Sequence, residues 1–415
     1  MTGSDASLPC RVCGAGLNHL FLDLGKTPLA NSYRTAEQLA GPDPVYPLVV
    51  RVCDACLLVQ AQPVVPAEDI FSDYAYFSSF STSWLDHAAR YCDMITSRLG
   101  LDADSFVVEI ASNDGYLLRN FVARHIPCLG VEPAANVAAT AVARGVPTEV
   151  LFFGEQTADA LREQYRPADL IAANNVLAHV PDLNDFVAGF RRLLAPGGTV
   201  TVEAPHVLEL VRHVQFDTIY HEHYSYFSLF TLERVFAAHG LCLFDVERLP
   251  THGGSLRIFI CHDDDPRAAT AAANLAEVRA AEAAAGLDKP VGYDGMAARV
   301  AAVVTGLKAF LAEAAGAGKV VAAWGAAAKG NTLLNVAGVT SADIAFVVDM
   351  SPAKQGLFLP GSHVPIVTPE RLYETKPDYV LILPWNLAGE ISTQAAQVKA
   401  WAGRFVTAIP ELRVW

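Results

Sequence analysis

The segment SFVVEIASNDG, from Ser105 to Gly115, joins a short apolar run to a tight polar loop and the start of a helix. Three more apolar runs follow it, and each ends in polar residues: CLGVEP (128–133), ADLIAANNVLAHV (168–180) and GGTVTVEAP (197–205). Apolar strands that alternate with helical segments are typical of βαβ units around a parallel sheet. The sequence therefore predicts a doubly wound α/β sheet across the middle of the chain.

Upstream of that sheet, four of the eight cysteines form two Cys-x-x-Cys pairs, Cys10 with Cys13 and Cys53 with Cys56. One such turn places two thiolates on one side of an ion, so two turns complete the tetrahedral shell that zinc prefers. Disulfide pairs and a redox Cys-x-x-Cys are the alternatives. The pattern favours a structural zinc site.

Downstream, KVVAAWGAAAKGN (319–331) restarts the α/β pattern, with further strands expected in IAFVVDM (344–350) and DYVLILPWN (378–386). An Ala-rich segment from Pro266 to Gly316 predicts long helices. At about 100–200 residues per domain, 415 residues suggest two to four domains. We expect a zinc-binding domain at 1–68, a central doubly wound domain at 69–286, and a smaller Rossmann-like α/β domain at 287–415.

The overall charge limits the partners. Lys and Arg number 30 against 44 Asp and Glu, a formal net charge of -14, which argues against a general affinity for nucleic acid or an anionic membrane. No run of 18 apolar residues and no export-type N-terminal segment is present. No heptad pattern or long apolar stripe marks a protein interface. We expect a cytoplasmic protein with no membrane, nucleic-acid or obligate protein partner, in which any phosphate is bound locally.

The loop Glu109 to Gly115 lacks the Gly-x-Gly-x-x-Gly fingerprint of dinucleotide sites, which argues against a pyrophosphate beneath it. Glu132 ends the next strand, about 20 residues on, the spacing at which a carboxylate reaches ribose hydroxyls. A nucleoside without a pyrophosphate meets both conditions, and S-adenosylmethionine is such a ligand. Ordinary turn residues of an α/β sheet remain the alternative.

The run Tyr220-His-Glu-His-Tyr224 places three ionisable groups and two phenols in five residues. A histidine is suited to removing an acidified proton near pH 7, and a neighbouring carboxylate can fix its tautomer. The run therefore indicates a general base. A second metal site formed by His221, Glu222 and His223, or a polar cluster that braces helices, remains the alternative.

Motifs of this kind extend along essentially the whole chain. Besides the cysteine pairs and the EIASNDG loop they are DLGKTPLANSY (23–33), YAYFSSFSTSW (74–84), NNVLAHVPD (174–182), YHEHYSYFS (220–228), HGGSLR (252–257), GAAAKGNTLLN (325–335), VVDMSPAKQG (347–356) and PWN (384–386). Together they resemble the S-adenosylmethionine-dependent deoxysugar C-methyltransferases of antibiotic pathways. That family places a methyl branch on carbon 3 of nucleotide-linked 4-keto sugars.

The resemblance implies that His223 is the base that generates an enolate beside the sugar ketone. The other residues that it implies for the site are Tyr220, Glu222, His179 and one of Tyr74 and Tyr76. His179 and the phenols would donate to the developing oxyanion. His179 could equally be a packing residue at the end of a strand.

The expected cofactor contacts follow the sheet. S-adenosylmethionine would be surrounded by Glu109, Ser112, Asn113, Asp114, Gly115, Glu132, Asn174 and Asn175. A thymidine diphosphate-linked substrate needs local positive charge, for which the candidates are Lys329, Lys354 and Arg257. Lysines beside Ala-rich turns are also often merely solvated.

Two other classes of function remain open from the residues. One is a methyltransferase that acts on oxygen or nitrogen of a sugar or another small molecule, in which His223 would deprotonate a hydroxyl or ammonium group. The other is a nucleotide-sugar binding protein without activity, which the intact loop and His-Glu-His cluster argue against.

Overall fold

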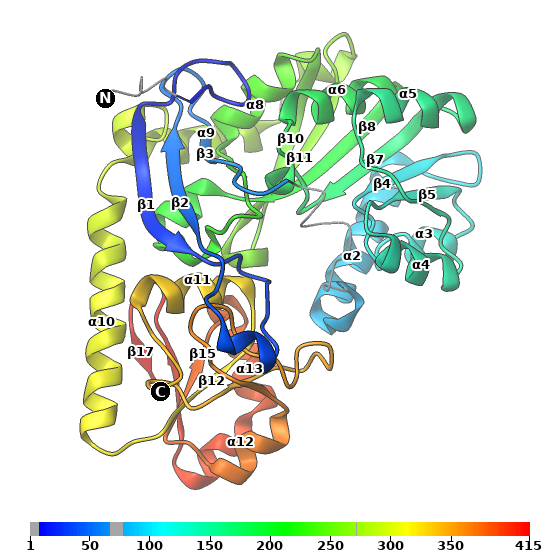
Figure 1. The fold of residues 1–415 in the computed structure, drawn as a ribbon. Helices are drawn as coiled ribbons and strands as arrows, with labels where there is room; N and C mark the ends of the chain where they lie inside the picture. The colour runs from blue at the N-terminus through cyan, green and yellow to red at the C-terminus, as the bar shows by residue number, and fades with distance from the viewer. Residues whose placement is uncertain (1–7, 67–77, 271) are drawn as a thin grey trace.

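The computed structural model describes residues 8–66, 78–270 and 272–415, which contain a four-stranded, a seven-stranded and a six-stranded sheet (Figure 1). The predicted α/β class, with an N-terminal cysteine cluster, a central sheet domain and a mostly parallel C-terminal sheet, is confirmed. Apolar side chains on both faces of the central strands explain why they form a buried parallel sheet.

The N-terminal sheet is antiparallel throughout. Its order is β1 (His19–Thr27), β2 (Tyr46–Val52), β3 (Val59–Ala61) and β9 (Ser225–Tyr226). The last of these strands comes from the central part of the chain, directly after the Tyr220–Tyr224 run. The cysteine-bearing segment and the predicted base are therefore tied together by one sheet.

The central sheet confirms the four predicted strands and adds three more. Its order is β10 (Leu241–Leu249), β11 (Ser255–His262), β8 (Leu194–Pro205), β7 (Ala168–Asn174), β4 (Val107–Ile110), β5 (Cys128–Val131) and β6 (Thr148–Glu149). The strands from β8 to β6 are parallel, whereas β10, β11 and β8 pair antiparallel. The parallel strands end at one edge of the sheet, where the polar loops gather.

The C-terminal sheet is parallel except for its last strand. Its order is β14 (Ile366–Val367), β13 (Val347–Val348), β12 (Val321–Trp324), β15 (Tyr379–Ile382), β16 (Arg404–Thr407) and β17 (Arg413–Val414). The predicted strands in 319–331, 344–350 and 378–386 are β12, β13 and β15.

The helices pack around these sheets. The α-helices are α2 (Thr82–Leu99), α3 (Arg119–Val122), α4 (Ala135–Ala143), α5 (Glu155–Gln164), α6 (Leu183–Leu193), α7 (Val207–Arg212), α8 (Leu229–Ala237), α9 (Ala273–Ala284), α10 (Met296–Gly316), α11 (Ala328–Ala337), α12 (Pro369–Thr375) and α13 (Ala388–Gln394). The short 3-10 helices are η1 (Glu37–Ala40), η2 (Ser78–Phe80), η3 (Leu177–His179), η4 (Phe216–Thr218), η5 (Thr251–Gly253), η6 (Pro266–Ala269), η7 (Pro290–Tyr293), η8 (Trp385–Leu387) and η9 (Ala396–Trp401). The predicted Ala-rich helical segment contains α9 and α10.

Helix α10 runs along one side of the molecule, from the upper sheets to the C-terminal domain in the view of Figure 1. By length and composition alone, the helical segment Pro290–Gly316 could cross a membrane. The long core helix of a protein meets the same criterion, and α10 buries one stripe of side chains, among them Val300, Val303, Leu307 and Leu311. This stripe belongs to a core that also contains Phe21 of β1 and residues of the C-terminal sheet.

Candidate active site

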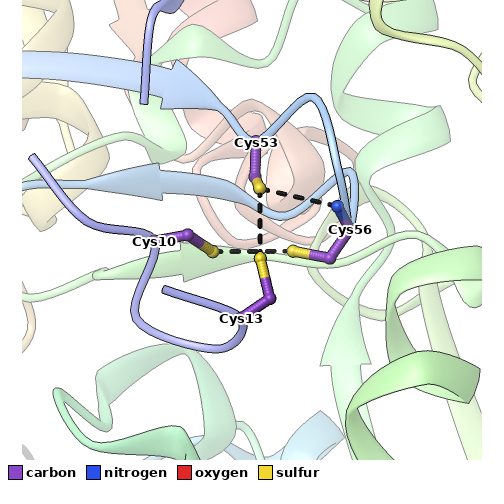
Figure 2. A group of neighbouring side chains, drawn as sticks. All are labelled: Cys10, Cys13, Cys53 and Cys56. Atoms are coloured by element: carbon purple, nitrogen blue, oxygen red, sulfur yellow. Dashed lines mark hydrogen bonds between the residues drawn. The ribbon is translucent and has the colours of Figure 1, made fainter. Parts of the chain in front are cut away.

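The four paired cysteines meet at one point (Figure 2). The Sγ atoms of Cys10 and Cys56 lie 3.5 Å apart, as do those of Cys13 and Cys53, and all four lie within 4.8 Å of one another. The Gln60 side-chain amide donates to the Cys10 sulfur over 3.1 Å. Contact with the Cys56 thiol lowers the pKa of Cys10 to about 4.

Four soft sulfur ligands at this spacing suit a tetrahedral zinc ion. The donor set offers no position for a catalytic water, so the four cysteines would hold zinc in a structural role. The ion would fix the turn at Cys10 and Cys13 to the turn at Cys53 and Cys56.

The loop after β4 needs unusual backbone geometry. Ala111, Asn113 and Gly115 have φ angles of 56°, 51° and 77°. A Cβ atom at Gly130, on the neighbouring strand β5, would lie 2.4 Å from the Ser112 hydroxyl oxygen. The absence of a side chain at Gly130 therefore lets the loop fold against β5.

Several buried polar atoms around this loop have no hydrogen-bond partner among the described residues. They are both carboxylate oxygens of Glu109, the hydroxyl of Ser112, one carboxylate oxygen of Asp114, the side-chain oxygen of Asn174 and both amide atoms of Asn175. Leaving such atoms unpaired is costly, so they indicate a polar ligand at the ends of β4 and β7. The residues present thus fit the expected S-adenosylmethionine.

The acidic groups of the loop differ in their partners. The Glu132 carboxylate accepts the backbone N–H groups of Asn113 and Ala134, each over 2.9 Å. Burial raises the pKa of Glu132, and these two hydrogen bonds lower it. Burial raises the pKa of Glu109 well above its usual range, while a contact with Tyr116 lowers it. A cationic ligand with hydroxyl groups would favour the ionised form of both carboxyls.

Asp114 braces the loop. It accepts from Arg144 over 2.8 Å and from the Ser79 hydroxyl, and its side chain is fully buried. Gly115 packs against Val146, where a Cβ atom would come within 2.9 Å. These two residues shape the loop, while the second carboxylate oxygen of Asp114 has no hydrogen-bond partner among the described residues.

His223 is held at both ring nitrogens. Its Nδ1 lies 2.8 Å from the backbone oxygen of Thr218, and its Nε2 lies 2.8 Å from the Tyr220 hydroxyl. Because a carbonyl oxygen can only accept, Nδ1 carries the proton and Nε2 is the basic atom that accepts from Tyr220. The neutral ring is thus fixed in the tautomer that a general base requires.

Two more histidines surround this base. The ring centres of His179 and His223 lie 4.6 Å apart. Burial lowers the pKa of His223 well below its usual range, and the nearby His179, His252 and Lys329 add to this effect. Burial also lowers the pKa values of His179 and His252 to about 4. All three rings are therefore neutral at neutral pH.

Glu222 is bonded to the N-terminal segment, and it is not among the hydrogen-bond partners of His223. The side-chain amide of Asn31 donates to both of its carboxylate oxygens, over 2.7 and 2.9 Å. Burial raises the pKa of Glu222 to about 7, and the bonds from Asn31 lower it. The expected pairing of this carboxylate with the imidazole is wrong, because the Thr218 carbonyl fixes the tautomer of His223.

Positive charge comes to the cluster from the C-terminal domain. Lys329 Nζ donates to the side-chain oxygen of Asn386 over 2.7 Å and lies 5.0 Å from the centre of the Trp385 ring. Trp385 Nε1 in turn donates to the buried Asp217 over 2.8 Å. Burial lowers the pKa of Lys329, whereas Asp217 raises it. One cation thus stands beside neutral histidines.

Three family profiles match the chain in sequence order. A zinc binding domain family matches residues 10–71, a methyltransferase domain family matches 84–245, and the C-methyltransferase C-terminal domain family matches 250–410. The C-methyltransferase NovU of Streptomyces niveus is 36% identical over 411 residues, which are 98% of this chain and 96% of NovU. The chain belongs to the C-methyltransferase family. It is an S-adenosylmethionine-dependent C-methyltransferase with a four-cysteine zinc-binding domain.

Solved structures resemble this C-methyltransferase only in part. A SAM-dependent methyltransferase from Anabaena variabilis is 13% identical and covers 42% of this chain and 84% of its own, with a TM-score of 0.34. One from Clostridium acetobutylicum is 11% identical and covers 42% and 91%, with a TM-score of 0.35. Similarity at this level adds nothing to the family assignment, which selects carbon over oxygen or nitrogen as the methyl acceptor.

The structure separates the three cations expected to bind substrate. Lys329 lies in the histidine cluster of the C-methyltransferase. Lys354 Nζ donates to the backbone oxygen of Ala326 over 2.9 Å. Arg257 is 4% exposed and paired with Glu203 over 2.8 Å and with Glu247 over 3.0 Å. Arg257 thus makes two ion pairs, and its contact with the substrate stays a prediction.

Tyr74 and Tyr76 lie outside the described residues. Sequence reasoning gave no role to Asn31, Asp217, His252 or Trp385, although three of them stand in the quoted motifs DLGKTPLANSY, HGGSLR and PWN. His252 has a φ of 54°, which is uncommon for a residue other than glycine. For Asn31, His252 and Trp385, their place in these motifs was the available signal.

Proposed function

We propose that this C-methyltransferase transfers the methyl group of S-adenosylmethionine to carbon 3 of a thymidine diphosphate-linked 4-keto-deoxysugar, through an enolate made by His223. The observation that supports this most strongly is the fixed tautomer of His223, with Nδ1 bound to Thr218 and Nε2 turned to Tyr220. A base prepared in this way is needed to activate a carbon acid.

The reaction begins when the pair formed by His223 and Tyr220 accepts the proton from carbon 3. The electrons of the broken C–H bond form a double bond to carbon 4, and the ketone oxygen becomes negative. Because the pKa of His223 is held low by burial, the free base is present at neutral pH. The ring gains its positive charge in the same step in which the sugar gains its negative charge, and each charge stabilises the other.

The negative oxygen needs stabilisation. The candidates are His179, which contacts His223, and the tyrosine expected from residues 74–76. A single well-placed donor to an oxyanion is typically worth about 3 kcal/mol. When bound, S-adenosylmethionine supplies the methyl group that carbon 3 attacks.

The cofactor contacts are proposed from the unpaired polar atoms. Glu109, Ser112, Asn174 and Asn175 would surround the methionine part, and Glu132 would accept the ribose hydroxyls. The backbone bends at Asn113, Asp114 and Gly115 would hold the loop in shape. These assignments follow the general rule that ligands bind beyond the carboxyl ends of parallel strands.

The substrate diphosphate would be met by Lys329, because it is the cation that lies within the histidine cluster. A diphosphate would replace Asn386 as its partner and favour the charged amine. Lys354, which holds the loop at Ala326, would act indirectly. We assign the substrate part of the site to the domain from residue 287 to 415, the cofactor part to residues 69–286 and zinc to residues 1–68, in a cytoplasmic enzyme.

The position of the new methyl group tests the proposal. The enzyme is incubated with S-adenosylmethionine carrying a carbon-13 methyl group and with thymidine diphosphate-linked 4-keto-deoxysugars that differ at carbons 2 and 3. Nuclear magnetic resonance should show the label bonded to carbon 3. Label on oxygen or nitrogen, or on another ring carbon, would contradict the proposal.

A further inference from the structure

Asn31, in the N-terminal segment, contacts the carboxylate of Glu222 in the Tyr220–Tyr224 run. Asn31 lies 191 residues before Glu222, and its amide nitrogen is 2.7 and 2.9 Å from the two carboxylate oxygens. Glu222 is 3% exposed. An amide that bonds both oxygens fixes the carboxylate plane, and its N–H groups prefer the ionised form as acceptor.

Asn31 is itself held from outside its own segment. Asn331 of α11 donates to the backbone oxygen of Ala30, the residue before Asn31, over 2.5 Å. The hydroxyl of Tyr33 donates to the backbone oxygen of Ala326 over 2.6 Å. The Tyr33 hydroxyl also lies 3.4 Å from the side-chain oxygen of Asn31. The segment is thus anchored on both sides of Asn31, mainly through backbone oxygens of Ala30 and Ala326.

The surroundings of Glu222 give its carboxylate little other support. Burial raises the pKa of Glu222 and the Asn31 amide lowers it, and the two influences together give a pKa of about 7. The titratable group that faces it from the N-terminal segment is Tyr33, whose pKa burial raises above its usual range. His179 forms a hydrogen bond with the backbone of Glu222 and not with the Glu222 carboxylate.

We propose that Asn31, a residue of the N-terminal zinc-binding part of the chain, is a positioning residue that holds the Glu222 carboxylate in place for methyl transfer. The inference rests on the proposed function, in which His223, the residue that follows Glu222, is the base. It assigns the first domain a direct part in the reaction, in addition to its metal site. The anchors at Ala30 and Tyr33 keep the segment folded, so the amide of Asn31 is left to act on Glu222.

The test compares Asn31→Ala and Asn31→Asp with Ser32→Ala. Asp has the shape of Asn but brings an acceptor and a charge to the carboxylate, so it separates hydrogen bonding from packing. The Ser32 hydroxyl donates to the backbone oxygen of Leu29 over 2.8 Å and makes no contact with Glu222. Ser32→Ala therefore reports on the segment alone.

Two quantities are measured. Infrared difference spectra, with Glu222→Gln to identify the band, give the pH at which the Glu222 carboxyl ionises. Removing a hydrogen bond to a buried charge should raise this pH by about 1–2 units in Asn31→Ala. Both Asn31 variants should lower kcat about tenfold or more, Asn31→Asp most, while the Kd for S-adenosylmethionine stays as in wild type.

An unshifted Glu222 titration in Asn31→Ala overturns the proposal, and so does a shifted titration with kcat unchanged. Equal losses in Ser32→Ala would show that the segment as a whole matters, which also overturns it. If the wild-type enzyme methylates no 4-keto sugar, the proposed function fails. The spectra then decide alone whether Asn31 holds Glu222.

Discussion

At the scale of single residues, the decisive features are backbone contacts that leave no trace in sequence. The motif Tyr220–Tyr224 predicts a base, but the partner of His223 Nδ1 is a carbonyl oxygen, which every residue carries. The sequence therefore predicted His223 as the base, but it could not predict the group that fixes the tautomer of this ring. The sequence could not predict the contact between Asn31 and Glu222, because 191 residues separate the two.

Replacing His223 with alanine should remove turnover while cofactor binding survives. General base catalysis typically contributes 10²–10⁴-fold, so kcat should fall by about that factor. The expected cofactor contacts lie on the loops after β4, β5 and β7, and His223 is not one of them. Isothermal titration calorimetry should give a wild-type Kd for S-adenosylmethionine, and a clear loss of affinity would contradict the division between base and cofactor site.

Glu132→Ala should weaken S-adenosylmethionine binding at least tenfold. The substitution removes the expected ribose acceptor and frees the two backbone N–H groups that Glu132 binds. The same calorimetric titration measures the change. An unaltered Kd would exclude Glu132 from the ribose site.

The buried neutral histidines make stability depend on pH. His252 takes up a proton near pH 6.5 when unfolded, but only at a pKa of about 4 when folded. Between these values the unfolded state binds more protons, so the free energy of unfolding decreases as the pH falls through this window. Each such group contributes on the order of 1 kcal/mol per pH unit.

Urea unfolding of the wild type and of His252→Asn between pH 7 and pH 4.5 measures this dependence. Asparagine is chosen because it tolerates a positive φ. The variant should lose less stability on acidification than the wild type. Parallel curves would show that His252 is not buried in its neutral form.

At the scale of elements, apolar runs were enough to predict β4, β5, β7, β8 and the strands of the C-terminal sheet. The strands β10 and β11 were not among those predicted. They pair antiparallel at the edge of a parallel sheet and place η5, with His252, between them. The extent of the central sheet depends on this pairing, which the alternation of strands and helices does not reveal.

The loop after β4 depends on a small residue in β5. A Cβ atom at Gly130 would lie 2.4 Å from the Ser112 hydroxyl, so Gly130→Ala should displace the loop and weaken S-adenosylmethionine binding. Gly306→Ala, within α10, is the matched control because nothing lies within 4 Å of its added Cβ atom. The control should stabilise the protein by about 0.5–1 kcal/mol. Equal cofactor affinities in the two variants would refute the close packing at Gly130.

At the scale of the whole molecule, three sheets surround one site. The sequence predicted the zinc cluster and both α/β units because each has a local pattern. It did not show that β9 completes the N-terminal sheet, or that one core joins β1, α10 and the C-terminal sheet. These contacts are long-range, and they bring Asn31, His223 and Lys329 together.

Loss of zinc should therefore affect activity as well as folding. Cys10→Ser should release the metal and lower the melting temperature, because the ion joins two turns far apart in sequence. Elemental analysis and thermal unfolding measure the two effects. Metal-free enzyme that melts as the wild type would show that the four cysteines have no structural role.

The central claim, that His223 generates an enolate at carbon 3, is tested most directly by hydrogen exchange. The wild type and His223→Ala are incubated in heavy water with the 4-keto sugar and S-adenosylhomocysteine, which has no methyl group to give. Proton magnetic resonance should show loss of the carbon 3 signal with the wild type and its retention with His223→Ala. Retention with the wild type, or equal exchange with both proteins, would contradict the account.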